Sequence, residues 1–298
     1  MMNVLITGAK GQLGLELASL ETEFSNLQFF YTDKTTLNII DFEEVEQFVS
    51  ENKIGVIVNC AAYTNVDKAE DEPEMANEVN HLAVKNLVLT AKKYSLKLIH
   101  ISTDYVFDGE SSIPYSEGDS TNPQNVYGST KLKGEEALLK INPKNSIIIR
   151  TSWVYSEYGH NFVKTVLRLS KEKESLSVVS DQIGSPTYAY DLAKVILQII
   201  PKINNESVQI YHYANKGECS WFQFASAIMK IAQRSCNVLP VNSSEFKTKA
   251  KRPKFSLLNT KKIQHTFNLE IPDWEDSLKE CIKPPNPQMG AERKENVQ

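Results

Sequence analysis

The sequence predicts an α/β fold: a Rossmann-type doubly wound parallel sheet with a smaller C-terminal substrate-binding lobe. Three observations predict this fold. Short β-branched runs alternate with longer helical patterns through the first half of the chain. These runs are mostly apolar, as in parallel strands that helices cover on both faces. A glycine-rich turn, TGAKGQLG, joins the first run to the first helical pattern.

Each element follows from its local pattern. The expected strands cover residues 4–6, 27–32, 56–58, 98–101 and 147–149. The first helix is expected at residues 12–20, and Asp41 caps a second, with Glu44 at the capping-box position. Pro73 begins a long helix that continues at least to Ala91. Helices in the second half are expected at residues 162–169, 192–200, 222–232 and 274–281.

We therefore expect a dinucleotide-binding Rossmann domain at residues 1–150 and a mainly substrate-binding lobe at 151–283. Residues 181–205 of that lobe could return to the Rossmann sheet. Residues 284–298 combine prolines with charge and have no apolar periodicity, so a flexible tail is expected there.

Composition excludes several classes of function. A net charge of −4 gives no general attraction to nucleic acid or to anionic membranes. The four cysteines form no C-x-x-C pair, which argues against a zinc or redox motif and suits a reducing cytosol. Neither a signal peptide nor an apolar run of roughly 18 residues is present. A cytoplasmic protein is expected.

The glycine turn predicts a dinucleotide site. Gly8 allows a tight turn, Gly11 lets the backbone approach a pyrophosphate, and Gly14 completes the spacing within the first helix. Asp33 ends the second strand, where a carboxylate binds ribose hydroxyls and repels a 2′-phosphate. Lys10 and Lys34 could offset that repulsion, so the residues leave NADH and NADPH both open.

Thr103, Tyr127 and Lys131 predict proton delivery to a carbonyl oxygen. Tyr127 and Lys131 are four apart and share one helix face. An adjacent ammonium is expected to lower the pKa of the phenol, while Thr103 supplies a second hydrogen bond. Thr103 and Tyr127 are both expected at the carboxyl edge of the predicted sheet, where ligands bind in this architecture. The same spacing in Tyr190 and Lys194 follows no such strand and is interpreted as structural.

Seven stretches in order resemble the extended short-chain dehydrogenase/reductase family and, within it, the dTDP-4-dehydrorhamnose reductases. They are TGAKGQLG, NCAAYTNVDKAE, STDYVFDG, NVYGSTKLKGE, RTSWVY, DQIGSPTY and RPKFSLL. The resemblance implies an NADPH- or NADH-dependent oxidoreductase that reduces the C4 keto group of a nucleotide sugar, dTDP-4-dehydro-β-L-rhamnose, to give dTDP-L-rhamnose.

The resemblance also implies roles for individual residues. Tyr127 is the proton donor, with Lys131 and Thr103 as its catalytic partners. The cofactor contacts are Gly11, Gln12, Leu13, Asp33, Asp41, Phe42, Ala62, Tyr63 and Thr64. The substrate contacts are Thr103, Asp104 and Trp153. For Asp41 and Phe42, a helix cap with a core aromatic is an equal alternative. Trp153 has the alternative of an ordinary core aromatic.

Two departures from relatives are informative. Nucleotide-sugar dehydratases carry a glutamate where this chain has Tyr105, so elimination of water is not expected. Some reductases hold magnesium at a dimer interface; Glu16 matches one ligand, but Tyr190, next to Asp191, occupies the other position. No metal is therefore predicted, and a homodimer stays open. Arg252, in a lysine-rich run, is a candidate for the substrate's diphosphate, with a solvated loop as the alternative.

The sequence leaves two alternatives to this function. The regulatory subunit of methionine adenosyltransferase resembles the same reductases and acts by binding a partner enzyme. Trp153 and the DQIGSPTY stretch favour the reductase over it. A reductase for a different nucleotide sugar is the second alternative.

Overall fold

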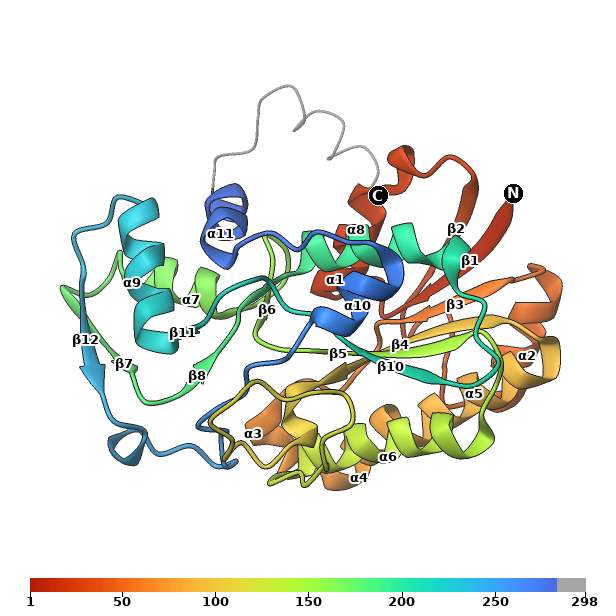
Figure 1. Cartoon of the computed structure of the whole chain (residues 1–298), viewed down its shortest axis with the longest axis horizontal. Coiled ribbons are helices and arrows are strands. Elements are labelled where there is room, and N and C mark those ends of the chain that lie inside the picture. Colours follow the sequence, from red (N-terminus) through yellow and green to blue (C-terminus); the bar gives the residue numbers. More distant parts are fainter. Residues whose placement is uncertain (283–298) are drawn as a thin grey trace.

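The computed structural model describes residues 1–282 and is built around a six-stranded parallel sheet with strand order β10-β5-β4-β3-β1-β2 (Figure 1). Its strands are β1 (Met2–Thr7), β2 (Leu27–Thr32), β3 (Val56–Asn59), β4 (Lys97–Thr103), β5 (Ser146–Thr151) and β10 (Gln209–His212). The predicted doubly wound α/β fold is confirmed. The sixth strand, β10, was not predicted, because its sequence QIYH mixes polar and apolar residues at the sheet edge.

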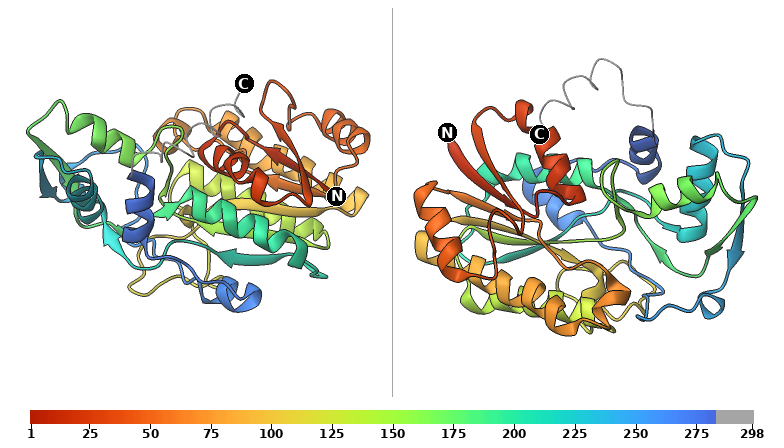
Figure 2. Two further views of the ribbon diagram at one scale, coloured as in Figure 1. Left: turned by 90° about the horizontal axis from the view of Figure 1, so that it is seen from above. Right: turned by 180° about the vertical axis from the view of Figure 1, so that it is seen from behind.

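Helices cover both faces of this sheet (Figure 2). One face packs against α1 (Gln12–Ser19), α8 (Ala189–Ile199) and α10 (Lys261–Phe267). The other packs against α2 (Phe42–Glu51), α5 (Ala83–Tyr94) and α6 (Val126–Ile141). Successive strand residues alternate between the two cores: Val4 and Ile6 belong to the first, Leu5 to the second.

The long helix expected from Pro73 is interrupted. It consists of α4 (Pro73–Asn77), a π-helical turn (Glu78–Leu82) and α5. Asn80, in the π turn, is fully buried, accepts a hydrogen bond from the Tyr63 backbone N–H at 2.8 Å and donates to Thr130 Oγ1 at 3.1 Å. Helical periodicity predicts an uninterrupted helix here, since a π turn leaves no signal in apolar spacing.

The second lobe has its own apolar core. It contains α7 (Phe162–Leu169), α9 (Trp221–Ile231), α11 (Trp274–Ile282), and the parallel pair β7 (Ser175–Val179) and β12 (Asn237–Val241). Two short pairs connect it to the sheet: β6 (Val154–Tyr155) with β9 (Thr187–Tyr188), and β8 (Ile183–Gly184) with β11 (Cys219–Ser220). A further short helix, α3 (Val66–Ala69), follows β3.

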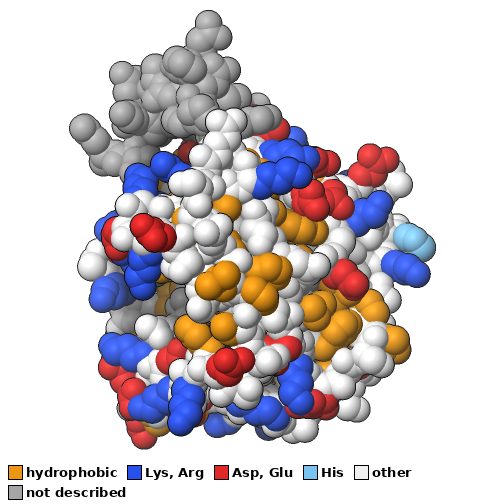
Figure 3. Space-filling model, turned by 90° about the vertical axis from the view of Figure 1, so that its left-hand side faces the viewer, with side chains coloured by type: hydrophobic (Ala, Val, Ile, Leu, Met, Phe, Trp, Pro, Cys, Tyr) orange, Lys and Arg blue, Asp and Glu red, His pale blue; other side chains and the backbone are white. Residues whose placement is uncertain are grey.

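The chain returns to the Rossmann sheet twice after residue 151, first through α8 and β10 and then through α10. The division at residue 150 stays a proposal about domains, and the expected tail at 284–298 lies outside the described residues. Figure 3 looks at the second lobe end-on, and its surface mixes hydrophobic side chains with charges of both signs. Within residues 1–282, no helix is both long enough and apolar enough to span a bilayer.

Candidate active site

The glycine turn between β1 and α1 is shaped by close backbone approach. Gly8 has φ +67°, and a Cβ there would lie 2.7 Å from the Cα of Ala61, two residues after β3. A Cβ on Gly14 would lie 2.6 Å from Ala9 Cα. Gly11 is the N-cap of α1 and provides no side-chain cap. The turn thus offers an uncapped helix N-terminus, which suits a pyrophosphate.

The two residues after Gly11 point away from that turn in different directions. Leu13 is buried in the core against the sheet, so only its backbone is available to a ligand. The Gln12 side chain reaches the second lobe, where its Oε1 accepts a hydrogen bond from Asn161 Nδ2 at 2.8 Å. The turn therefore also joins the two lobes.

Asp33 lies at the end of β2 with its carboxylate already engaged. Lys10 Nζ is 2.5 Å from Oδ2, and Thr35 donates to Oδ1 through its hydroxyl and its N–H. The hydrogen bond from Lys10, followed by those from Thr35, holds the pKa of Asp33 well below its usual range. A cation therefore stands beside the carboxylate predicted to meet the adenosine ribose, as the lysine spacing suggested.

Asp41 and Phe42 begin α2. Asp41 Oδ1 accepts hydrogen bonds from the N–H groups of Glu43 and Glu44, so the predicted cap is present. Glu44 does not complete a capping box with Asp41; its Oε1 accepts from the Asn38 N–H at 3.0 Å. Phe42 is partly buried. The capping alternative thus accounts for Asp41, and its contact with adenine stays a prediction.

The segment after β3 passes close to the glycine turn. Ala62 and Tyr63 are partly buried and Thr64 is exposed. The Tyr63 hydroxyl donates to Glu72 Oε2 at 2.7 Å, while Asn80 bonds both backbone groups of Tyr63. Asn80, which sequence reasoning missed, therefore fixes this predicted cofactor segment.

Thr103 and Tyr127 meet at the carboxyl edge of the sheet. Thr103 ends β4 and Tyr127 lies in the first turn of α6. Burial raises the pKa of the partly buried Tyr127, and a hydrogen bond with the Thr103 side chain opposes this rise. The phenol therefore stays protonated over the physiological range, as a proton donor must.

Lys131 lies one turn further along α6 and is 2% exposed. Its Nζ donates to the backbone oxygen of Ile101 at 2.6 Å. Burial lowers its pKa to about 8, while Glu135 opposes that shift. Here the ammonium of Lys131 contacts Ile101 and burial is the largest influence on the phenol, so the expected lowering of the pKa of Tyr127 by Lys131 stays a prediction.

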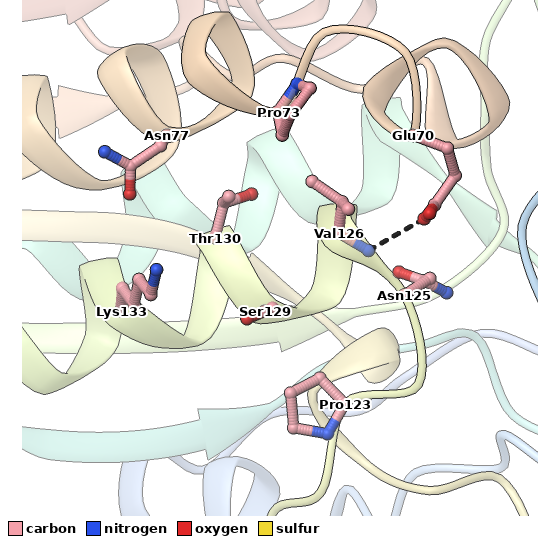
Figure 4. Close-up of a pocket in the computed structure, with 9 residues that line it drawn as sticks. All are labelled: Glu70, Pro73, Asn77, Pro123, Asn125, Val126, Ser129, Thr130 and Lys133. Carbon is pink, nitrogen blue, oxygen red and sulfur yellow. Dashed lines mark hydrogen bonds between the residues drawn. The ribbon is translucent and has the colours of Figure 1, made fainter.

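The start of α6 is fixed from two sides. Asn125 Oδ1 accepts a hydrogen bond from the Gly128 N–H at 2.8 Å. Glu70 Oε1 accepts from the Val126 N–H at 2.8 Å, at one end of a hollow of about 410 Å³ between α6 and α4 (Figure 4). Neither Tyr127 nor Lys131 lines this hollow. It supports the turn that carries Tyr127 without being part of the predicted cleft.

Asp104 follows Thr103 and is buried. Its Oδ1 accepts from Thr103 Oγ1 at 3.0 Å. Burial raises the pKa of Asp104 to about 6, and the Thr103 and Ser256 side chains oppose this rise. A carboxyl group with this pKa can both accept and donate hydrogen bonds near neutral pH.

Arg252 reaches the neighbourhood of Tyr127 from the second half of the chain. Its Nη1 donates to the Tyr105 hydroxyl at 3.0 Å, and its Nη2 lies 2.5 Å from Asp67 Oδ2. The Tyr105 ring is edge-on to Tyr127, with centroids 5.5 Å apart. Three neighbouring lysines form exposed ion pairs instead, as the solvated-loop alternative expects: Lys249 with Asp71, and Lys251 and Lys254 with Glu110.

Trp153 follows β5 by two residues and has φ +47°. Its ring stacks on Trp221, with centroids 3.6 Å apart and an interplanar angle of 11°. It is partly buried. The aromatic predicted to meet the substrate is thus held by a second tryptophan from α9, which the sequence did not single out.

The residues considered for a metal have protein partners. Glu16 Oε1 accepts from the Ser156 hydroxyl at 2.6 Å. Asp191 Oδ2 accepts from Asn215 at 2.7 Å and from Ser277 at 2.5 Å. Tyr190 stacks against Tyr188 in the interior. Among residues 1–282, no group of three or more His, Cys, Asp or Glu side chains is arranged to hold a metal ion.

Comparison with known proteins adds an independent observation. The model of the RmlD substrate binding domain family matches residues 2–286. A dTDP-4-dehydrorhamnose reductase from Aggregatibacter actinomycetemcomitans is 43% identical, over 94% of this chain and 98% of its own. A spore coat polysaccharide biosynthesis protein of Bacillus subtilis is 39% identical, over 95% and 98% respectively.

Solved structures agree with the architecture. The crystal structure of a dTDP-4-dehydrorhamnose reductase from Bacillus anthracis in complex with NADP has a TM-score of 0.89, with 40% identity over 94% of this chain and 99% of that one. The Clostridium acetobutylicum reductase gives the same TM-score of 0.89, with 40% identity over 94% and 98%. A dTDP-glucose 4,6-dehydratase at 18% identity has a TM-score of 0.80 and shows only the shared fold.

Proposed function

We propose that this chain, a member of the RmlD substrate binding domain family, is a dTDP-4-dehydrorhamnose reductase. It reduces the C4 keto group of dTDP-4-dehydro-β-L-rhamnose to give dTDP-L-rhamnose. The observation that carries the proposal is the position of Thr103 at the end of β4 and of Tyr127 in the first turn of α6, with Lys131 one helical turn away.

The residues present suit a nicotinamide dinucleotide. The uncapped start of α1 and the close approach of Gly8 to Ala61 leave room for a pyrophosphate against backbone N–H groups. Asp33 and Lys10 would hold the adenosine ribose, and Lys131 the ribose at the other end. When bound, the reduced nicotinamide supplies the hydride.

The chain's own residues manage the proton and the developing charge. The hydroxyls of Thr103 and Tyr127 bind the carbonyl oxygen and stabilise the negative charge that develops on it. Tyr127 then donates its phenolic proton to that oxygen, and the Lys131 ammonium stabilises the resulting phenolate.

The cofactor is proposed to be NADPH, with NADH as a weaker alternative. The Lys10 ammonium beside Asp33 offers a cation to a 2′-phosphate, and the Bacillus anthracis relative was crystallised with NADP. We further propose that the enzyme works in the cytoplasm, either alone or as a homodimer.

Reduction fits the site better than its rivals. Dehydratases need a carboxylate that removes a proton, and this chain has Tyr105 at that position. The dehydratase chemistry of more distant relatives is therefore not proposed. A purely regulatory subunit would not need Trp153 on a strained backbone beside the strand ends. A reductase for another nucleotide sugar is the remaining alternative.

The test is to follow the near-ultraviolet absorbance of NADPH and NADH with dTDP-4-dehydro-β-L-rhamnose and other nucleotide keto sugars. We expect oxidation of NADPH with the dTDP sugar, and a fall of about 100-fold or more in Tyr127→Phe. Tyr190→Phe, which alters the second Y-x-x-x-K pair, should keep nearly full activity. No oxidation with any keto sugar, or full activity in Tyr127→Phe, would refute the proposal.

A further inference from the structure

Trp153 adopts a backbone conformation that a bulky side chain rarely takes. Its φ of +47° lies in the left-handed region, where such residues persist only when their surroundings hold them. One restraint is a backbone bond to β9: the Trp153 backbone oxygen accepts a hydrogen bond from the Thr187 N–H at 3.2 Å. The position is also close to the chemistry, because Thr151, two residues earlier, pairs in register with Thr103.

The ring of Trp153 is held from the second lobe. It stacks on Trp221 with ring centroids 3.6 Å apart. Trp221 is the first residue of α9, whose N-cap Ser220 forms a capping box with Gln223. The Phe162 ring lies against Trp221 as well, at 4.6 Å between centroids. Trp221 is therefore a fixed surface rather than a mobile side chain.

A third contact connects this stack to the strand ends. A Cβ on Gly184 would lie 2.8 Å from Trp153 Cε2 and 2.7 Å from Ser256 Oγ, so only glycine leaves the indole its place. The Ser256 side chain in turn lies near the buried Asp104 carboxyl group and lowers its pKa. The position of the Trp153 ring is thus set by both lobes, next to the residues predicted to meet the keto sugar.

We propose that Trp221 is a specificity-determining positioning residue: by stacking on Trp153 it fixes the indole that receives the sugar of the nucleotide substrate. An indole offers an apolar surface to a sugar ring. A ring that is already immobilised loses less conformational entropy when the sugar binds. The inference deepens the proposed function and rests on it.

The experiment compares steady-state kinetics of Trp221→Leu, Trp221→Phe and Trp274→Phe. Losing one immobilised side chain corresponds to about a threefold to tenfold rise in the KM for dTDP-4-dehydro-β-L-rhamnose. We expect that rise in Trp221→Leu, with kcat and the KM for NADPH within about twofold of the wild type. Trp221→Phe should restore most of the affinity. Trp274→Phe alters the same apolar core outside the stack and is the control.

A spectroscopic measurement covers the case in which Trp221→Leu does not fold. The coupled indoles should give a near-ultraviolet circular dichroism signal that Trp153→Phe and Trp221→Phe both abolish and Trp274→Phe keeps. The signal should change when dTDP-L-rhamnose is added and not when NADP⁺ is added. A change with NADP⁺ alone, or an unchanged KM in folded Trp221→Leu, would overturn the role of Trp221.

The two proposals fail in different ways. A wild-type enzyme that oxidises NADPH with the keto sugar, combined with an unaffected Trp221→Leu, refutes the positioning role and leaves the reductase intact. A wild-type enzyme that does not turn over this sugar refutes the reductase and the positioning role together.

Discussion

Glu135 and Arg150 form an ion pair in the interior: Nη2 lies 2.6 Å from Oε2, and the two side chains are 0% and 3% exposed. Glu135 lies one turn beyond Lys131 on α6, and Arg150 is on β5. The same carboxylate accepts a hydrogen bond from Ser102 Oγ at 2.5 Å. The pair therefore ties α6 to the ends of the two strands that carry Thr103 and Thr151.

Removing one member of this pair should be strongly destabilising. Glu135→Ala leaves a buried guanidinium without its partner, which costs about 3–5 kcal/mol. We expect that loss in the free energy of unfolding measured with urea. Glu136→Ala, at the exposed neighbouring position, should change it by less than about 0.5 kcal/mol. The double variant Glu135→Leu/Arg150→Met should recover most of the loss, and no recovery would contradict the electrostatic explanation.

This ion pair illustrates what the sequence could not provide. Tyr127 and Lys131 were found because a four-residue spacing and a preceding strand together predict one helix face at one sheet edge. Glu135 continues that face, yet a glutamate within a charged helix is usually solvated. Its burial depends on a partner on β5, and pairing across elements is decided by the tertiary fold.

Other elements of the fold also separate into those that a local pattern predicts and those that depend on tertiary contacts. Strands β1 to β5 were predictable because their mostly apolar runs record burial against the covering helices. The edge strand β10 and the π turn around Asn80 depend on hydrogen bonds to distant residues, which periodicity does not record. Trp221 belongs to the same group, since only the fold brings α9 onto Trp153.

The pH dependence of turnover should report Lys131. Its pKa is lowered to about 8, whereas burial raises that of Tyr127. The profile of kcat/KM, which reflects groups of the free enzyme, should therefore fall as the pH rises through about 8. Because Glu135 raises the pKa of Lys131, Glu135→Gln should move this fall to lower pH, and Glu136→Gln should not. A fall at unchanged pH in Glu135→Gln would contradict the assignment.

The free energy of unfolding should also depend on the titration of Lys131, but it should rise with pH where kcat/KM falls. The folded pKa of Lys131 lies below that of an unfolded lysine, about 10.4. Between these two values the unfolded chain binds more protons, so the contribution of Lys131 to stability increases as the pH rises. Urea unfolding of the wild type and of Lys131→Met at several pH values isolates this contribution.

Lys10 should influence the choice of cofactor. Its ammonium lies 2.5 Å from the Asp33 carboxylate and is 79% exposed. An exposed charge gains only modestly from a phosphate partner. We therefore expect the KM for NADPH in Lys10→Ala to rise about threefold to tenfold. The KM for NADH serves as the internal control and should change little. Equal changes for both cofactors would mean that Lys10 does not meet a 2′-phosphate.

Arg252 should matter for the nucleotide sugar through geometry rather than charge alone. Its two Nη atoms bridge the Tyr105 hydroxyl and Asp67, beside the ring of Tyr127. Arg252→Ala removes both bonds, and we expect the KM for the keto sugar to rise about tenfold or more.

Two further variants separate geometry from charge. Lysine carries one point charge and cannot reproduce a planar fork, so Arg252→Lys should restore little of the affinity. Lys254→Ala removes an exposed cation that is paired at 3.5 Å with Glu110 and should leave the KM within about twofold, because surface pairs of this kind contribute little. If Arg252→Ala and Lys254→Ala changed the KM equally, Arg252 would act only through its charge, like the lysines of this segment.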